Sequence, residues 1–102
     1  MRKARYIRVS TGNQKTARQE ARQNKDEIIF TDIVSGSIPF EDREKGKDLM
    51  KAIQSGEIDY VSVSSIDRLG RNLYNILTTL EFFKENGIIL KVDSRSLTKP
   101  TI

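Results

Sequence analysis

Two arginines and an aspartate occur together in one short segment of the chain, residues 64–71. A guanidinium group binds phosphate through two parallel hydrogen bonds, which suits it to phosphoryl-transfer sites. Arg68 and Arg71 are three residues apart, so a helical turn would place both side chains on one face, next to Asp67. A surface salt bridge would account for one of these arginines but not for both. The segment therefore favours a phosphate site.

Ser10 is a second candidate for this chemistry. It follows an apolar segment typical of a strand and precedes a capping box, with Thr11 as N-cap and Gln14 three residues later. Backbone N–H groups at the start of a helix favour an anion, although helix capping alone would also explain Ser10. Arg8 lies inside the expected strand, where a buried cation needs a partner. A bound anion is one such partner.

The hydrophobic pattern predicts alternating strands and helices. We expect strands at 4–9, 27–31, 59–66 and 88–92, and helices at 11–24, 43–54 and 72–85. This order predicts an α/β fold with a parallel sheet and helices on both of its faces.

Two segments have further features that the sequence predicts. Segment 34–42 is expected to be a loop, because it contains Ser35, Gly36 and Pro39. The last helix has a continuous apolar stripe, which predicts a face packed on the core. The stripe consists of Leu73, Ile76, Leu77, Leu80 and Phe83.

The predicted fold brings the candidate residues together. Ligands of open α/β sheets bind beyond the carboxyl ends of the strands. Ser10 follows the first strand, Ser35 the second and Asp67 the third. If the first and third strands are neighbours, a hydroxyl, several guanidinium groups and a carboxylate surround one phosphate. Ser35 also fits an ordinary turn, and sequence alone favours that role.

Length and composition limit the classes of function. The chain has 102 residues, enough for one small domain, and a formal charge of +4. Residues 1–25 hold eight Lys or Arg side chains and one acid, which points weakly to nucleic acid or another polyanion; the alternative is a solvated basic face. Without Cys or His, disulfides, a Cys/His zinc site and a His-based triad are excluded. We see no membrane span and no export signal, and expect a cytoplasmic protein.

Four segments of the chain resemble, in order, the motifs of the serine recombinases, the resolvase/invertase family. They are Tyr6–Thr11 followed by Gln14 and Gln19, Asp32 with Ser35 and Gly36, Arg43 before Leu49, and Ile66–Arg71. Four motifs in register are far more specific than any one of them, and together they cover essentially the whole chain. The resemblance implies a three-layer α/β/α sandwich with a mostly parallel sheet in the strand order 2-1-3-4.

The resemblance also implies site-specific DNA strand exchange. Ser10 would attack a DNA phosphodiester and form a 5′-phosphoserine link, and the reverse attack would reseal the exchanged strands. Arg8, Arg68 and Arg71 would hold the scissile phosphate and neutralise charge in the transition state. Asp67 would orient an arginine or assist proton transfer.

Further positions follow from the same resemblance. Arg43 matches another catalytic arginine, and supporting or DNA-contacting positions would be Tyr6, Gln14, Gln19, Asp32 and Ser35. The phosphoserine link conserves the bond energy, so neither a metal nor another cofactor is expected. The implied partners are double-stranded DNA and, in a full-length protein, further copies forming a homodimer and a synaptic homotetramer. The implied setting is the nucleoid of a prokaryote, or a mobile element.

The chain departs from the family pattern in places. The segment between Gln19 and Asp32 is short, and Glu44 stands where proline is common. Family members normally continue into a dimerisation helix and a DNA-binding domain, so we expect residues 1–102 to be an isolated catalytic domain.

Three other functions are compatible with parts of the pattern. One is a transposase of the same chemistry, and resolution, inversion and integration are equally open. Another is a catalytically silent oligomerisation module, which would have no need of Ser10 and the arginines. The third is a small nucleotide- or phosphate-binding domain, against which stands the lack of a Gly-rich fingerprint after the first strand.

Overall fold

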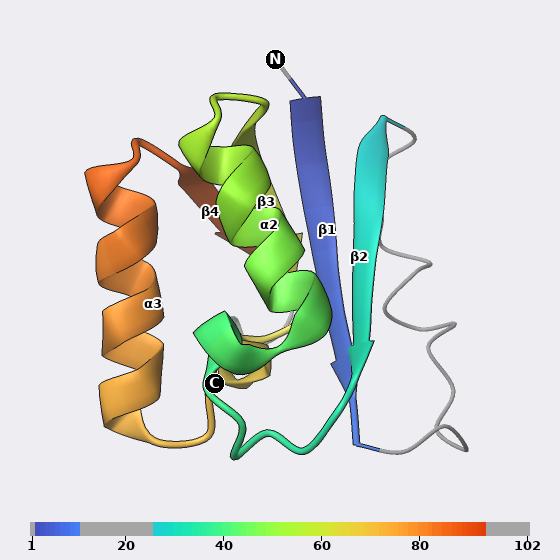
Figure 1. Ribbon diagram of the computed structural model, residues 1–102, viewed down its shortest axis with the longest axis vertical. Helices are drawn as coiled ribbons and strands as arrows, with labels where there is room; N and C mark the ends of the chain where they lie inside the picture. Colours follow the sequence, from blue (N-terminus) through green and yellow to red (C-terminus); the bar gives the residue numbers. More distant parts are fainter. Residues whose placement is uncertain (1, 11–25, 94–102) are drawn as a thin grey trace, which may run out of the picture.

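The computed structural model describes residues 2–10 and 26–93, and its centre is a sheet of four parallel strands (Figure 1). The strands are β1 (Arg2–Val9), β2 (Glu27–Ile33), β3 (Ile58–Val63) and β4 (Ile89–Val92). Their order is β2-β1-β3-β4, so β1 and β3 are neighbours. This confirms the parallel α/β fold and the strand order expected from the sequence.

Two helices, α2 (Glu44–Gln54) and α3 (Leu73–Glu85), pack on one face of the sheet. The rings of Phe40 and Phe83 meet edge to face at 6.3 Å between centroids, which joins the segment before α2 to α3. The helix expected at 11–24 lies outside the described residues.

The core lies between this face of the sheet and the helices. Apolar side chains pack there from every described strand and helix, as the spacing of each element requires. Fully or almost fully buried members are Ala4, Tyr6, Phe40, Leu49, Ile53, Ile58, Val61, Val63, Leu69 and Phe83.

The third strand ends at Val63, earlier than the expected end at residue 66. Val63 pairs with Val92, the last residue of β4, so the ladder stops there. The chain then forms a 3₁₀ turn, η2 (Ile66–Arg68), closed by a 3.2 Å hydrogen bond from the amide of Arg68 to the carbonyl of Ser65. The functional segment is therefore a tight turn just beyond the sheet.

The start of α2 also differs from the expectation. Arg43 is the N-cap and not the first helical residue, with an extended backbone at φ −85° and ψ 142°. A second 3₁₀ turn, η1 (Phe40–Asp42), precedes it within the segment expected to be a loop. The amide of Arg43 donates to the carbonyl of Phe40 at 3.1 Å, which closes η1 directly before α2.

The apolar stripe of α3 is buried only in part, so that expectation was wrong for the first half of the helix. Phe83 is buried, but Leu73 is 70% exposed and Leu77 is 54% exposed. Thr79, which is not part of the stripe, is buried, so the covered face of the helix is rotated away from Leu73 and Leu77. Periodicity identified the apolar stripe, but the face that the fold covers coincides with it only in part. None of the helices described here has the length and apolarity of a membrane span.

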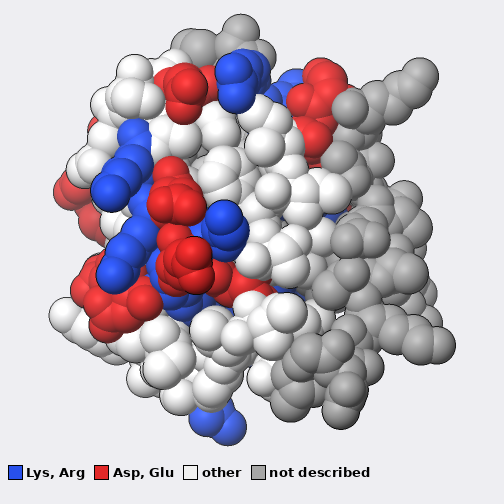
Figure 2. Space-filling view, turned by 45° about the vertical axis from the view of Figure 1, so that its right-hand side comes forward, with Lys and Arg blue, Asp and Glu red and all other residues white. Residues whose placement is uncertain are grey.

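The excess of basic residues near the N-terminus does not lie wholly on the surface. Of the basic residues in that region that are described, Arg5 and Arg8 are buried within the sheet. On the face that Figure 2 presents, basic and acidic side chains are interspersed. Part of the basic charge near the N-terminus is therefore buried and is not available on the surface.

Candidate active site

A pocket of about 250 Å³ opens at the carboxyl ends of β1, β2 and β3. It is lined by residues that follow or end three different strands, as expected for an open parallel sheet. The lining residues are Arg8, Ser10, Ser35, Gly36, Asp67 and Arg71. Sequence segments far apart in the chain therefore meet around one small polar cavity.

Arg8 connects the strand to the candidate nucleophile. Its Nη1 atom donates to Ser10 Oγ at 3.4 Å and to the carbonyl oxygen of Val34 at 3.0 Å. The Ser10 residue is exposed, while Arg8 is only 8% exposed. A cation that donates to a hydroxyl oxygen stabilises negative charge developing on that oxygen. The arrangement can thus assist ionisation of Ser10 in a site where no histidine is present.

The electrostatics of the pocket favour an anion. Burial lowers the pKa of Arg8, and the neighbouring charges of Arg68 and Arg43 lower it further. Asp67 opposes this effect, but it is one carboxylate near several guanidinium groups. A phosphate in the pocket would reduce the mutual repulsion of these cations.

The segment that first suggested a phosphate site is shaped differently from the expectation. Arg68 is the last residue of η2, whereas Arg71 lies beyond the turn, after Gly70. No helical turn spans the two arginines, so the prediction of one shared helical face was wrong. Arg71 lines the pocket directly. Gly70 permits this path, since a Cβ there would lie 2.9 Å from Asn75 Cβ, at the start of α3.

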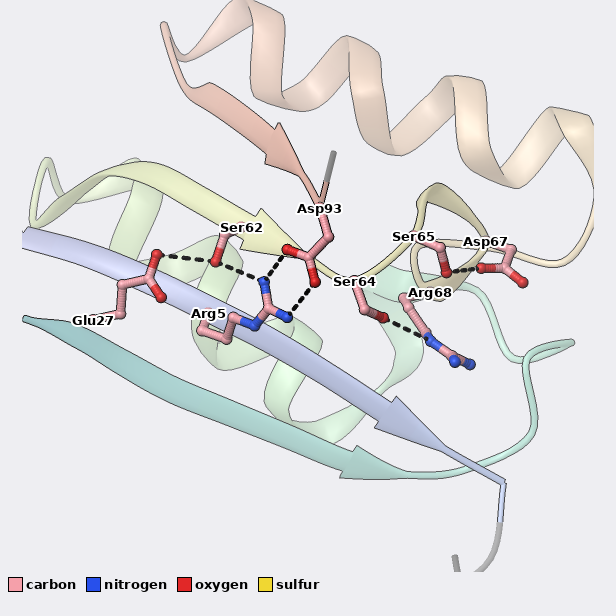
Figure 3. A network of polar contacts seen from close by, with 8 residues as sticks. All are labelled: Arg5, Glu27, Ser62, Ser64, Ser65, Asp67, Arg68 and Asp93. Atoms are coloured by element: carbon pink, nitrogen blue, oxygen red, sulfur yellow. Dashed lines mark hydrogen bonds and ion pairs between the residues drawn. The ribbon is translucent and has the colours of Figure 1, made fainter. Parts of the chain in front are cut away.

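Serine hydroxyls contact two of the charged residues of η2 (Figure 3). Arg68 Nε donates to Ser64 Oγ at 3.3 Å, and Ser65 Oγ donates to Asp67 Oδ1. Sequence reasoning did not single out either serine. Their position directly before the Asp-Arg pair was the available signal.

Arg43 lies behind the pocket and does not line it. The side chain is buried, with the residue 1% exposed. Its Nε atom donates to the carbonyl oxygen of Ile38 at 2.9 Å, its Nη2 to that of Gly36 at 3.4 Å, and its Nη1 to that of Arg68. Nη1 also donates to Tyr6 Oη at 3.2 Å. One guanidinium group thus joins the loop after β2, the turn η2 and the central strand.

Tyr6 and Asp32 extend this network to helix α2. Tyr6 Oη donates to Asp32 Oδ2 at 2.8 Å, and burial raises the pKa of Tyr6, which keeps the hydroxyl protonated. Asp32 also accepts hydrogen bonds from the amides of Lys45 (2.9 Å) and Gly46 (3.0 Å). Anionic capping of a helix N-terminus stabilises the helix. Asp32 therefore anchors α2 beside the site.

The other residues predicted from the sequence divide into two groups. Ser35 lines the pocket, and it also forms a turn in which Ser37 N donates to its Oγ at 3.1 Å. Gln14 and Gln19 lie outside the described residues. Within 2–10 and 26–93, no group of three or more acidic side chains is arranged to hold a metal ion.

A buried network of hydrogen bonds within the sheet was also not predicted from the sequence. Arg5 donates to Asp93 and to Ser62, and Ser62 donates to Glu27 at 3.0 Å (Figure 3). All of these residues are buried. A charged residue at an interior strand position was the one sequence signal for it.

Comparison with known proteins adds an independent line of support. Residues 3–101 match the family model described as resolvase, N-terminal domain. The chain is 40% identical over 86 residues to the transposon Tn552 resolvase of Staphylococcus aureus, covering 81% of this chain and 41% of the relative. It is 34% identical over 95 residues to a DNA-invertase of Escherichia phage P1, covering 91% and 47% respectively. The chain thus spans less than half the length of these two relatives.

A solved structure agrees with these matches in fold. The N-terminal catalytic domain of TP901-1 integrase superposes with a TM-score of 0.74 at 27% identity, over 94% of this chain and 80% of that one. The family match covers nearly the whole chain, and three of the four motifs that carry the resemblance contribute described residues to the lining of the pocket. The chain therefore belongs to the resolvase N-terminal domain family, the catalytic domains of serine recombinases.

Proposed function

We propose that this domain cleaves and rejoins DNA through a 5′-phosphoserine intermediate, with Ser10 as the nucleophile. The observation that carries the proposal is the position of the Ser10 hydroxyl, exposed at an arginine-lined pocket and 3.4 Å from Arg8 Nη1. The names of the relatives, a resolvase and a DNA-invertase, support a DNA substrate.

The proposed step conserves the number of phosphoester bonds. Ser10 Oγ forms a bond to phosphorus as the bond from phosphorus to the 3′ oxygen breaks. The serine proton is lost, and the departing oxygen gains a proton to become a 3′-hydroxyl. Attack by a 3′-hydroxyl on the phosphoserine reverses the step and reseals a strand. No nucleotide triphosphate is required.

The charged residues have separate roles in this proposal. Arg8 and Arg71, which line the pocket, and Arg68 beside it stabilise charge on the phosphate in the transition state. Asp67 orients an arginine or accepts a proton. Arg43 contributes by fixing the turn that carries Arg68, because it holds the carbonyl oxygen of that residue.

The partners of the native protein follow from the number of strands. Each chain supplies one Ser10, so exchange between two duplexes, with four strands to cut, requires four chains. We therefore propose double-stranded DNA as the substrate and a homotetramer, assembled from dimers, as the active form. The bacterial and phage sources of the relatives support action at the nucleoid of a prokaryotic cell.

The test is to trap the covalent intermediate. The native protein that carries this domain is incubated with a supercoiled plasmid containing the DNA around its own gene, and the reaction is stopped with detergent. We expect a protein–DNA adduct whose 5′ ends resist a 5′-exonuclease after protease digestion, while the 3′ ends are extended by terminal transferase. Ser10→Ala should abolish the adduct and leave binding unchanged. An adduct that persists in Ser10→Ala, or one with blocked 3′ ends, would overturn the proposal.

A further inference from the structure

We infer that Ser64 and Ser65 are positioning residues that orient Arg68 and Asp67 for the reaction. The inference rests on the proposed function, because it assigns these serines to the same site. Each hydroxyl contacts one charged side chain of η2, and neither is required to form the turn itself.

Ser65 occupies the N-cap position of η2 but does not cap it. Its backbone is extended, with φ −156° and ψ 160°, as in ordinary caps, yet its side chain makes no capping hydrogen bond. The hydroxyl donates instead to Asp67 Oδ1, and no other described residue donates a hydrogen bond to this carboxylate. The turn is closed by the backbone of Ser65, whose carbonyl accepts from the amide of Arg68 at 3.2 Å. The hydroxyl is therefore available to fix one oxygen of Asp67.

Ser64 fixes the other charged side chain. Arg68 Nε donates to Ser64 Oγ at 3.3 Å, and the carbonyl oxygen of Arg68 accepts a hydrogen bond from Arg43. Arg68 is thus held at both its backbone and the near end of its guanidinium group. In Figure 3 the terminal amino groups of Arg68 point away from Ser64. With Nε occupied, Arg68 presents these two amino groups, and it binds phosphate end-on.

Ser62, two residues before Ser64 and still within β3, has a different role. Ser62 is buried and links Arg5 to Glu27, away from the pocket. Ser64 and Ser65 are only partly buried and contact residues of the turn. We therefore assign Ser62 to the stability of the fold, and Ser64 and Ser65 to the site.

The first test observes the anchoring directly in the 102-residue chain. Arginine side chains are labelled with ¹⁵N, and the Nε–Hε resonance of Arg68 is followed by NMR. We expect a resolved resonance in the wild type and in Ser64→Thr, and a broadened, solvent-exchanging one in Ser64→Ala. On titration with dimethyl phosphate, the terminal amino resonances should shift more than Nε–Hε. An Nε–Hε resonance of Arg68 that stays resolved in Ser64→Ala would overturn the role of Ser64. So would a titration in which Nε–Hε shifts more than the terminal amino groups.

The second test separates positioning from folding. In the native protein, Ser64→Ala and Ser65→Ala should slow cleavage at saturating protein by about 10- to 100-fold, the range for losing a hydrogen bond to a charged group. Affinity for the DNA should change less than about threefold, since the phosphate contacts that set it remain. Ser64→Thr and Ser65→Thr should restore most of the rate.

Ser55→Ala is the matched control, because the Ser55 hydroxyl donates to the carbonyl of Ala52 at the end of α2, outside the pocket. Unchanged cleavage in Ser64→Ala and Ser65→Ala, or threonine variants as slow as the alanine variants, would overturn the inference. If the wild type forms no Ser10-dependent adduct, the proposed function fails instead, and the NMR result alone decides whether Ser64 anchors Arg68.

Discussion

The guanidinium group of Arg5 forms two hydrogen bonds of 3.0 Å with the carboxylate of Asp93, a residue 88 positions later in the chain. Arg5 is on the central strand β1, and Asp93 directly follows the edge strand β4, so the pair spans β3 (Figure 3). Both residues are buried. The pair therefore joins the centre of the sheet to its edge.

Removing one member of this pair should strongly destabilise the domain. Asp93→Ala leaves a buried guanidinium group without its bidentate acceptor, and breaking a buried ion pair costs about 3–5 kcal/mol. Urea unfolding would measure the change in the free energy of unfolding. Asp48→Ala is the control, because the pair of Lys45 and Asp48 is half-exposed and should contribute less than about 1 kcal/mol. Equal effects of the two substitutions would contradict the assigned role.

Tyr6→Phe tests the network behind the pocket. The substitution removes the donor to Asp32 and one acceptor of Arg43, and both residues are buried. We expect a loss of about 1–3 kcal/mol in the free energy of unfolding, together with slower cleavage. Tyr74→Phe is the matched control, since Tyr74 is 75% exposed and should change stability by less than about 0.5 kcal/mol. A Tyr6→Phe protein as stable as the control would show that the hydroxyl contributes nothing.

Arg68→Lys should retain the charge but lose most of the cleavage activity of the native protein. Lysine cannot present two amino groups in a fixed plane, and losing one preorganised donor costs about 10²–10³ in rate. Single-turnover cleavage of the plasmid would measure the loss. Arg2→Lys, at an exposed position of β1, should have no effect. Activity near that of the wild type in Arg68→Lys would argue against end-on phosphate binding.

Cleavage by the native protein should survive chelation of metal ions. Guanidinium groups supply the positive charge around the pocket, and the described acidic side chains form no cluster suited to a metal. The measurement is adduct formation with and without EDTA, at constant ionic strength. Activity that disappears with EDTA and returns with Mg²⁺ would contradict the arginine-based mechanism.

Much of the fold was predictable, because apolar runs and turn residues report local structure. The strand order came from the family resemblance, and with that order the convergence of Ser10, Ser35 and Asp67 on one edge follows from a parallel sheet. The cover of α3 was not predictable in this way. Periodicity identifies an apolar face, but whether Leu73 and Leu77 are covered depends on which face the helix turns toward the sheet, and that face carries Thr79 and Phe83.

The networks behind the site were also hidden from sequence reasoning. Arg5 and Asp93 are separated by nearly the whole described chain, and no local pattern links them. Arg43 was identified only by family resemblance, and its partners include three backbone carbonyl oxygens, a kind of acceptor that every residue type offers. The side-chain types of Gly36, Ile38 and Arg68 therefore could not indicate that their carbonyl groups bind Arg43.

This use of carbonyl groups has a consequence for how the site can evolve. The two ends of one hydrogen bond place different demands on the sequence: Arg43 supplies a guanidinium side chain, whereas Ile38 supplies only its backbone carbonyl, and the residue is 37% exposed. Substitutions can therefore accumulate at position 38 without loosening the bond. The loop after β2 can therefore change its side chains while the arginine network behind the pocket stays the same.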